Sequence, residues 1–217
     1  MFGKCLLTLF FVYVCLVLGV CPAQAQDEEF ENLLQNPDFE NAGDAPWTMW
    51  VEGAAAGAAA VKSVDKGESY TGKQSLLLEI IGKGNGQRVE LHQNPIVVDK
   101  GQQLTYAFWA KTEKDTVVEG RMIMNHRADP WTSYGSTNIK ITDEWQEFWT
   151  PVNITVDDPI GGIYIELRDT AKVQIWFDHF RLYEGEYFEE EEEGKPKIAV
   201  ESNSKLISTW ADIKSAR

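Results

Sequence analysis

Two acidic side chains, one near each end of the chain, have surroundings that suit a bound cation. Glu40 closes the segment Asn32–Glu40 and is followed by turn residues. Asp178 lies within Val173–Glu184, which alternates apolar and polar positions and is rich in aromatic residues. A carboxylate inside such a strand is costly unless a hydrogen-bond donor or a positive charge meets it. A cation shared by Glu40 and Asp178 is the simplest partner and favours a secreted β-sandwich over an enzyme.

The elements that position these acids are expected to be strands. From residue 31 to about residue 187, short runs of strand-forming residues alternate with turn residues, and no convincing helix interrupts them. The alanine-rich stretch Gly53–Val61 has helical propensity, but its flanking glycines and its place between strands favour an extended conformation. The regular spacing predicts an all-β, antiparallel sandwich or barrel. Strands are expected at 75–81, 88–92, 104–110, 117–125, 144–150, 163–167 and 172–183.

The first 25 residues have the features of a signal peptide. Lys4 precedes the apolar run Leu6–Val20, and Ala23–Ala25 forms a small-x-small cleavage site. The apolar run is short for a membrane span, and no second run follows it. We therefore expect a secreted, extracellular protein. The alternative is a periplasmic or cell-surface lipoprotein modified at Cys21.

Composition narrows the classes of partner. Cys5, Cys15 and Cys21 all lie in the expected signal peptide, so no disulfide framework is expected in the mature chain. Without those 25 residues the chain carries 19 Lys and Arg against 34 Asp and Glu. Such an acidic surface argues against nucleic acid and anionic membranes as partners. It is compatible with soluble neutral or cationic ligands and with calcium.

The composition changes after Tyr187. Residues 188–203 contain the acidic run Glu189–Glu193 and are expected to form a solvated linker. Residues 204–217 place Leu206, Trp210 and Ile213 on one face of a short amphipathic helix. This C-terminal tail either packs on the domain or serves as a docking or sorting tag for a partner.

Six motifs in order along the chain resemble those of the CenC-type carbohydrate-binding modules, and the resemblance covers about residues 31–187. It implies a β-jelly roll, a galactose-binding-like fold of two antiparallel sheets. One concave face would hold a glycan chain, and a structural calcium would lie at the rim. The motifs are Asn32-Leu-Leu-x-Asn-Pro-x-Phe-Glu40, Trp47, Gly72-Lys-Gln-Ser-Leu76, Tyr106-x-Phe-Trp-Ala-Lys111, Glu144-Trp-Gln146 and Trp176-Phe-Asp-x-Phe-x-Leu-Tyr183.

The resemblance also implies the calcium ligands. They would be the carbonyl of Asp38 and the side chains of Glu40 and Asp178, joined by Glu68 and a carbonyl from the turn at 71–73. Hard carboxylate and carbonyl oxygens suit calcium. The alternatives are a surface acid for Glu40 and a hydrogen-bonded strand residue for Asp178.

Sugar binding requires aromatic faces against pyranose rings, with polar groups for the hydroxyls. The segment 125–134 enters a proline-containing loop, where Trp131 and Tyr134 are the candidate aromatic residues and His126 a polar one. Trp47 and Trp50 are candidates for one end of the groove, although Trp47 is more simply placed beneath the N-terminal loop. For Trp131 and Tyr134 the alternative is a ring tucked into the domain edge.

Strand alternation supplies the polar partners. If Val89 and Leu91 face the core, the residues between and beside them face outward. The same holds for the strand around Ile165. The alternative is a charged outer sheet with internal pairs such as Arg88 with Glu166. The outward residues are Arg88, Glu90, His92, Tyr164, Glu166 and Arg168.

These observations predict a secreted, non-catalytic module that binds a polysaccharide of the β-glucan or xylan type. One alternative is a glycoside hydrolase, or an accessory subunit of one, with Glu90 and Glu166 as paired carboxylates. Against it, the binding fold already occupies the whole domain. A second alternative is a cell-surface adhesion or assembly protein with the same fold, for which a flat apolar patch is expected in place of a groove.

Overall fold

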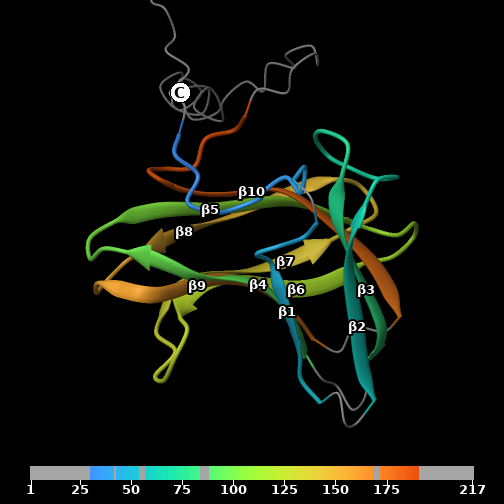
Figure 1. Ribbon diagram of the computed structural model, residues 1–217, viewed down its shortest axis with the longest axis horizontal. Helices are drawn as coiled ribbons and strands as arrows, with labels where there is room; N and C mark the ends of the chain where they lie inside the picture. The colour runs from blue at the N-terminus through green and yellow to red at the C-terminus, as the bar shows by residue number, and fades with distance from the viewer. Residues whose placement is uncertain (1–29, 42, 54–56, 84–87, 169–171, 191–217) are drawn as a thin grey trace, which may run out of the picture. The chain divides into compact units, whose positions relative to one another are not determined.

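The structure is a computed structural model that describes residues 30–190 except 42, 54–56, 84–87 and 169–171 (Figure 1). The chain divides into two units, residues 1–185 and 186–217, and the strands belong to the first. The expected signal peptide, most of the expected linker and the C-terminal tail lie outside the described residues. Within the described part, no helix has the length and apolarity needed to cross a membrane.

The described residues form ten strands in two five-stranded antiparallel sheets, the layers seen in Figure 1. The first sheet has the order β1-β4-β9-β6-β7 and the second β2-β3-β10-β5-β8. The expected antiparallel β-sandwich is therefore confirmed. The strands are β1 (Thr48–Val51), β2 (Ala58–Asp65), β3 (Ser75–Lys83), β4 (Arg88–Val98), β5 (Gln103–Thr112), β6 (Val118–His126), β7 (Ser133–Ile141), β8 (Gln146–Asn153), β9 (Asp158–Arg168) and β10 (Val173–Glu184).

The core lies between the sheets and follows from alternation along each strand. Leu91, Met122 and Ile165 point inward from the first sheet, and Phe108 and Phe177 from the second. All five are at most 1% exposed. Because alternate residues point to opposite faces, an apolar inner face leaves the polar residues of β4, β6 and β9 on the outer face of the first sheet.

Two strands were not expected from sequence, namely β1 and β7. Strand β7 has only Tyr134, Ile139 and Ile141 as buried apolar side chains, and its other positions are glycine, short polar residues and Lys140. It lies at the edge of its sheet, where an outer face in contact with water requires no apolar residues. The expected extended conformation of 53–61 is confirmed for 58–61, which open β2, whereas 54–56 lie outside the described residues.

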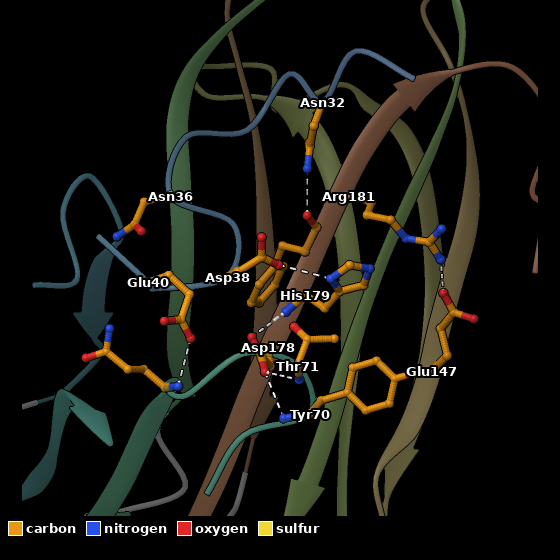
Figure 2. A network of polar contacts seen from close by, with 12 residues as sticks. Asn32, Asn36, Asp38, Glu40, Tyr70, Thr71, Glu147, Asp178, His179 and Arg181 are labelled. Atoms are coloured by element: carbon orange, nitrogen blue, oxygen red, sulfur yellow. Dashed lines mark hydrogen bonds and ion pairs between the residues drawn. The ribbon is translucent and has the colours of Figure 1, made fainter. Parts of the chain in front are cut away.

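The N-terminal segment pairs with the last strand. Asn32 donates from Nδ2 to the carbonyl of Phe180 at 2.8 Å and accepts from the amide of Leu182 at 3.1 Å (Figure 2). The Trp47 ring lies 4.2 Å from that of Phe180, and its Nε1 donates to the carbonyl of Asn36. These contacts place the two end segments side by side and Trp47 beneath the N-terminal loop, as expected.

A candidate ligand groove on the first sheet

A groove of about 680 Å³ lies on the outer face of the first sheet. Its lining comes from β1, β4, β9, β6 and the start of β7, together with the loop between β6 and β7. The sequence left open which sheet is concave, and the groove lies on the first. The lining residues are Trp50, Arg88, Glu90, His92, Arg121, Ile123, Asn125, Arg127, Trp131, Ser133 and Tyr164.

Strand register arranges these residues in rows across the sheet. One row runs from Trp50 on β1 through Glu90 on β4 and Glu166 on β9 to Arg121 on β6. Because neighbouring strands are about 4.8 Å apart, each row places side chains from different strands at regular intervals under a bound chain. A second row runs from His92 through Tyr164 and Ile123 to Ser136.

Arg127 lies against the sheet at the floor of the groove. The guanidinium of Arg127 lies 4.7 Å from the ring centroid of Tyr164, and its Nη2 lies 3.3 Å from Glu90 Oε2. Gly162 makes this path possible, because a Cβ there would come within 2.8 Å of both Arg127 Cγ and Asn94 Cβ. Arg127 thus joins its loop to β4 and β9.

Two exposed tryptophans stand at opposite edges of the sheet. Trp50 is on the edge strand β1 and is 42% exposed, and Trp131 is in the β6–β7 loop and is 54% exposed. Each packs near an arginine, Arg88 at 5.0 Å from the Trp50 ring and Arg127 at 5.6 Å from the Trp131 ring. Trp131 has a φ of 59°, which is rare for a bulky residue, so the surrounding loop must hold its backbone in this conformation.

Three buried polar atoms of groove residues have no hydrogen-bond partner among the described residues. Arg88 Nε is one, and it still lies 3.3 Å from Glu52 Oε2 as an ion pair. The other two are His92 Nδ1 and Asn125 Oδ1, and Asn125 is only 3% exposed. A buried polar group without a partner costs about 1–3 kcal/mol, and a ligand hydroxyl that reached His92 or Asn125 would supply one. Burial and the charge of Arg127 lower the pKa of His92, so its imidazole is neutral at pH 7.

The two carboxylates expected as a hydrolytic pair are held by arginines. Glu90 and Glu166 occupy directly opposed positions on β4 and β9. Burial raises the pKa of Glu166, but hydrogen bonds and charge from Arg168 and Arg88 outweigh it, and the pKa lies below its usual value. Glu166 Oε1 accepts from Arg168 at 2.8 Å and Oε2 from Arg88 at 3.2 Å. A general acid requires the opposite shift.

Several expected ligand residues meet in the groove. Trp131, Arg88, Glu90 and His92 line it together. Glu166 is only 3% exposed and lies in the same row as Glu90, beneath its arginine partners. The pairing of Arg88 with Glu166, the structural alternative, is thus present as well. Arg168 is not a lining residue and instead pairs with Glu166.

Tyr134 and His126 require a correction. Tyr134 points into the core at 5% exposure, and its hydroxyl donates to Asp158 Oδ2 at 2.9 Å. Burial and Asp158 raise its pKa to about 12. His126 Nδ1 lies 3.0 Å from the other Asp158 oxygen. Both residues bond to Asp158 at the start of β9. His126 ends β6 and Tyr134 lies in β7, which begins at Ser133, so neither belongs to the loop between these strands.

Sequence reasoning missed the β6 side chains of the groove, Arg121, Ile123 and Asn125, and the neighbouring Arg127. The three β6 residues are spaced by two, which places them on one face, opposite the buried Met122 and Met124. That alternation was readable once β6 was known to belong to the groove sheet.

Of the acids expected to bind calcium, Glu40 and Asp178 lie at the same turn (Figure 2). Asp178 Oδ2 accepts from the amides of Tyr70 and Thr71 at 2.8 and 3.0 Å. Glu40 Oε1 accepts from the amides of Lys73 and Gln74, in the same turn. Burial raises the pKa of Asp178 to about 6, with the nearby Asp38 charge adding to the effect.

The side chains of the other two expected residues have partners of their own, although the ligand expected from Asp38 is its carbonyl. Glu68 Oε2 lies 2.8 Å from Lys111 Nζ, and Asp38 Oδ1 lies 3.0 Å from His179 Nδ1. Within the described residues no three His, Cys, Asp or Glu side chains are grouped closely enough to hold a metal ion. The donors fit calcium in type at Glu40 and Asp178, and Glu68 does not fit because a lysine already occupies its carboxylate.

The sequence of the chain matches a family model described as a carbohydrate-binding domain over residues 31–172. A search of curated proteins found no match. Among solved structures, the fold is similar to that of a CBM4 module, with a TM-score of 0.56 and 22% identity over 70% of this chain and 99% of the other.

Two further structures share the fold. One is the CBM22-1 xylan-binding domain of Paenibacillus barcinonensis Xyn10C, with a TM-score of 0.55 and 18% identity over 71% of this chain and 95% of the other. The other is TmCBM61 in complex with β-1,4-galactotriose, with a TM-score of 0.51 and 20% identity over 71% of this chain and 99% of the other. At identities this low, the structural similarity establishes the jelly-roll fold alone.

Proposed function

Because the chain belongs to the family of carbohydrate-binding domains, we propose that the groove on the first sheet is where it binds its polysaccharide. The observation that carries this proposal is the combination of Trp50 and Trp131 at the two edges with the unpartnered atoms of His92 and Asn125 between them. Aromatic faces accept the apolar faces of sugar rings, and buried polar atoms accept hydroxyls.

The arrangement favours an extended chain over a single sugar. The groove crosses the strands from β1 to the β6–β7 loop, a span of three to four strand spacings, or about 14–19 Å. Several sugar rings fit across such a span. We propose a β-linked glucan or xylan as the ligand, and the xylan-binding domain with the same fold supports this choice.

We propose that the protein has no hydrolytic activity of its own. The family is a binding family, and Glu90 and Glu166 are both paired with arginines. Glu166, whose pKa is lowered by Arg168 and Arg88, is a poor proton donor. Association with a glycoside hydrolase, secretion through the N-terminal signal peptide and a stabilising calcium at Glu40 and Asp178 complete the proposal.

Affinity electrophoresis of the full-length protein against soluble glucans, xylans and mannans tests the binding proposal. Retardation by at least one β-glucan or xylan is expected. If folded protein, with calcium present, migrates unchanged through every polymer, the proposal is wrong.

Replacement of Trp131 tests the location of the site. Trp131→Ala removes an exposed ring at the groove edge, so we expect about tenfold weaker binding, the equivalent of about 1.4 kcal/mol. Trp149→Ala is the matched control, because Trp149 is 43% exposed on β8 of the other sheet. Equal loss in both variants would place the ligand elsewhere.

A further inference from the structure

The groove is positively charged on a strongly acidic protein. The whole chain has a net charge of −14. The groove lining contains Arg88, Arg121 and Arg127 against a single carboxylate, Glu90. Cations remain in excess when the adjoining partners Glu52, Glu166 and Arg168 are included. A local charge opposite to that of the whole molecule indicates the kind of ligand that the site attracts.

Arg121 differs from the other arginines of this surface in its partners. Arg88 lies 3.3 Å from Glu52 and 3.2 Å from Glu166, and Arg127 pairs with Glu90. Arg168 pairs with Glu166. The guanidinium of Arg121 donates to Ser136 Oγ at 3.1 Å, and it forms no ion pair with any carboxylate among the described residues. Its charge is therefore available to a ligand.

The position of Arg121 suits a charged substituent on a sugar. Arg121 and the unpartnered Asn125 lie on the same face of β6, with the apolar Ile123 between them. Because these side chains are spread over about 13 Å of β6, a bound glycan that covers Ile123 can present a hydroxyl at Asn125 and a carboxylate at Arg121. The neighbouring Glu166 does not oppose such a carboxylate strongly, since Arg88 and Arg168 neutralise it.

From these observations we propose that the groove selects acidic glycans, those bearing uronic acids, and that Arg121 binds the sugar carboxylate. The inference rests on the proposed function of the groove as the glycan site. Arginine suits the role because its planar fork can donate two parallel hydrogen bonds to a carboxylate. The other two arginines of the groove lining, Arg88 and Arg127, are already paired with carboxylates.

The test compares each acidic polymer with its own uncharged form. The affinity of the full-length protein is measured for each polymer before and after chemical reduction of its carboxyl groups to alcohols. The polymers are glucuronoxylan, polygalacturonate and alginate. We expect the wild type to bind at least one acidic polymer about fivefold more tightly than the reduced polymer, the effect of one accessible charge pair. Arg121→Gln should bind both forms with equal affinity.

The matched control is Lys100→Gln. Lys100 is exposed in the turn after β4, at the far end of that strand from Arg88, and its replacement removes the same charge outside the groove. Long-range repulsion between the acidic protein and a polyanion is then equal in the two variants. The control should keep the wild-type preference for the acidic polymer.

Four results would overturn the inference. The first is that the wild type binds reduced polymers as tightly as acidic ones, and the second is that Arg121→Gln loses affinity equally for both forms. The third is that Lys100→Gln loses the preference as Arg121→Gln does. The fourth is binding confined to neutral glucans and xylans, which leaves the proposed function intact. If folded protein binds no polymer of either kind, the proposed function fails as well.

Discussion

At the scale of single residues, the groove keeps polar atoms that the fold itself does not use. Asn125 is almost fully buried, and its Oδ1 has no partner among the described residues. Neighbouring positions of the same strand, such as Met122 and Met124, bury apolar side chains toward the core. An unsatisfied acceptor reduces stability, so its presence at the ligand groove indicates a function that outweighs this cost.

Asn125→Leu is expected to separate stability from binding. It replaces the unsatisfied amide with an apolar side chain of similar size, so we expect the free energy of unfolding to rise by about 1 kcal/mol. Binding of the polysaccharide should weaken, because a hydroxyl loses its partner. Thermal melts and affinity electrophoresis measure the two effects. A lower melting temperature would mean that the amide has a structural partner.

His92 makes stability depend on pH. Its pKa lies below 6.5 because of burial and the charge of Arg127. The unfolded chain therefore binds a proton at His92 more readily than the folded chain does, and the free energy of unfolding falls as the pH drops below about 6.5. We expect a loss between about pH 6.5 and pH 5 that is absent in His92→Gln.

The difference between wild type and variant is the quantity to measure, by denaturant unfolding at each pH. Asp178 has a raised pKa of about 6 and so contributes in the opposite direction, with stability rising as the pH falls through that value. It is present in both proteins and cancels in the difference. Parallel pH profiles for wild type and His92→Gln would contradict the assignment to His92.

At the scale of elements, Arg127 joins the β6–β7 loop to β9 and β4, and we treat these parts as one unit. Arg127 extends from the end of β6 across Gly162 and Tyr164 to Glu90. The same loop carries Trp131, whose ring lies near the Arg127 guanidinium. Contacts with β4 and β9 therefore hold Arg127, and Arg127 packs near the ring of Trp131. A ligand site requires side chains that are held in this way.

Gly162→Ala tests this unit. The added Cβ would lie 2.8 Å from both Arg127 Cγ and Asn94 Cβ, so the Arg127 side chain must move away from β9. We expect a loss of about 1–3 kcal/mol in the free energy of unfolding, together with weaker glycan binding. Chemical denaturation and affinity electrophoresis measure the two losses.

A double-mutant cycle with Arg127→Ala shows whether the effect acts through Arg127. If it does, Gly162→Ala costs less in binding when Arg127 is already truncated, and the two changes are not additive. Full additivity would mean that the added methyl group acts through Asn94 and β4, and Arg127 would not be the link.

At the scale of the molecule, the N-terminal segment closes the fold against the last strand. Asn32 donates to the carbonyl of Phe180, and the carbonyl of Asn36 accepts from the Trp47 indole. The carboxylates of Glu40 and Asp178 both accept hydrogen bonds from backbone amides of the turn 70–74. With all three cysteines in the expected signal peptide, these contacts and the core supply the stability of the domain. The proposed calcium would strengthen the same seam.

Removal of calcium tests that proposal. A ligand that binds only the folded state stabilises it by about 2.7 kcal/mol at a concentration one hundred times its dissociation constant. We therefore expect the melting temperature to fall by several degrees when a chelator is added, and Asp178→Asn to lose this response. Identical melts with and without chelator would reject the calcium.

Much of the fold was readable from local pattern. Alternation of apolar residues gave seven strands and the inward faces of β4 and β9, because one buried face of a sheet imposes a period of two. Residue type also predicted that Asp178, inside an apolar strand, needs a partner, and the structure supplies the amides of Tyr70 and Thr71. The pairing of the end segments themselves is made by Asn32 with Phe180 and Leu182. Strand β7 escaped, because an edge strand with few apolar residues leaves only a weak pattern.

The sequence by itself determined the family, the class of fold and the outward position of Arg88, Glu90 and His92. Only the tertiary structure decided which sheet is hollowed, that Tyr134 turns inward to Asp158, and that Arg127 crosses Gly162 to the floor of the groove. Alternation depends on neighbours along one strand and is therefore local. The groove depends on side chains from five strands that are far apart in sequence, and only their register brings them together.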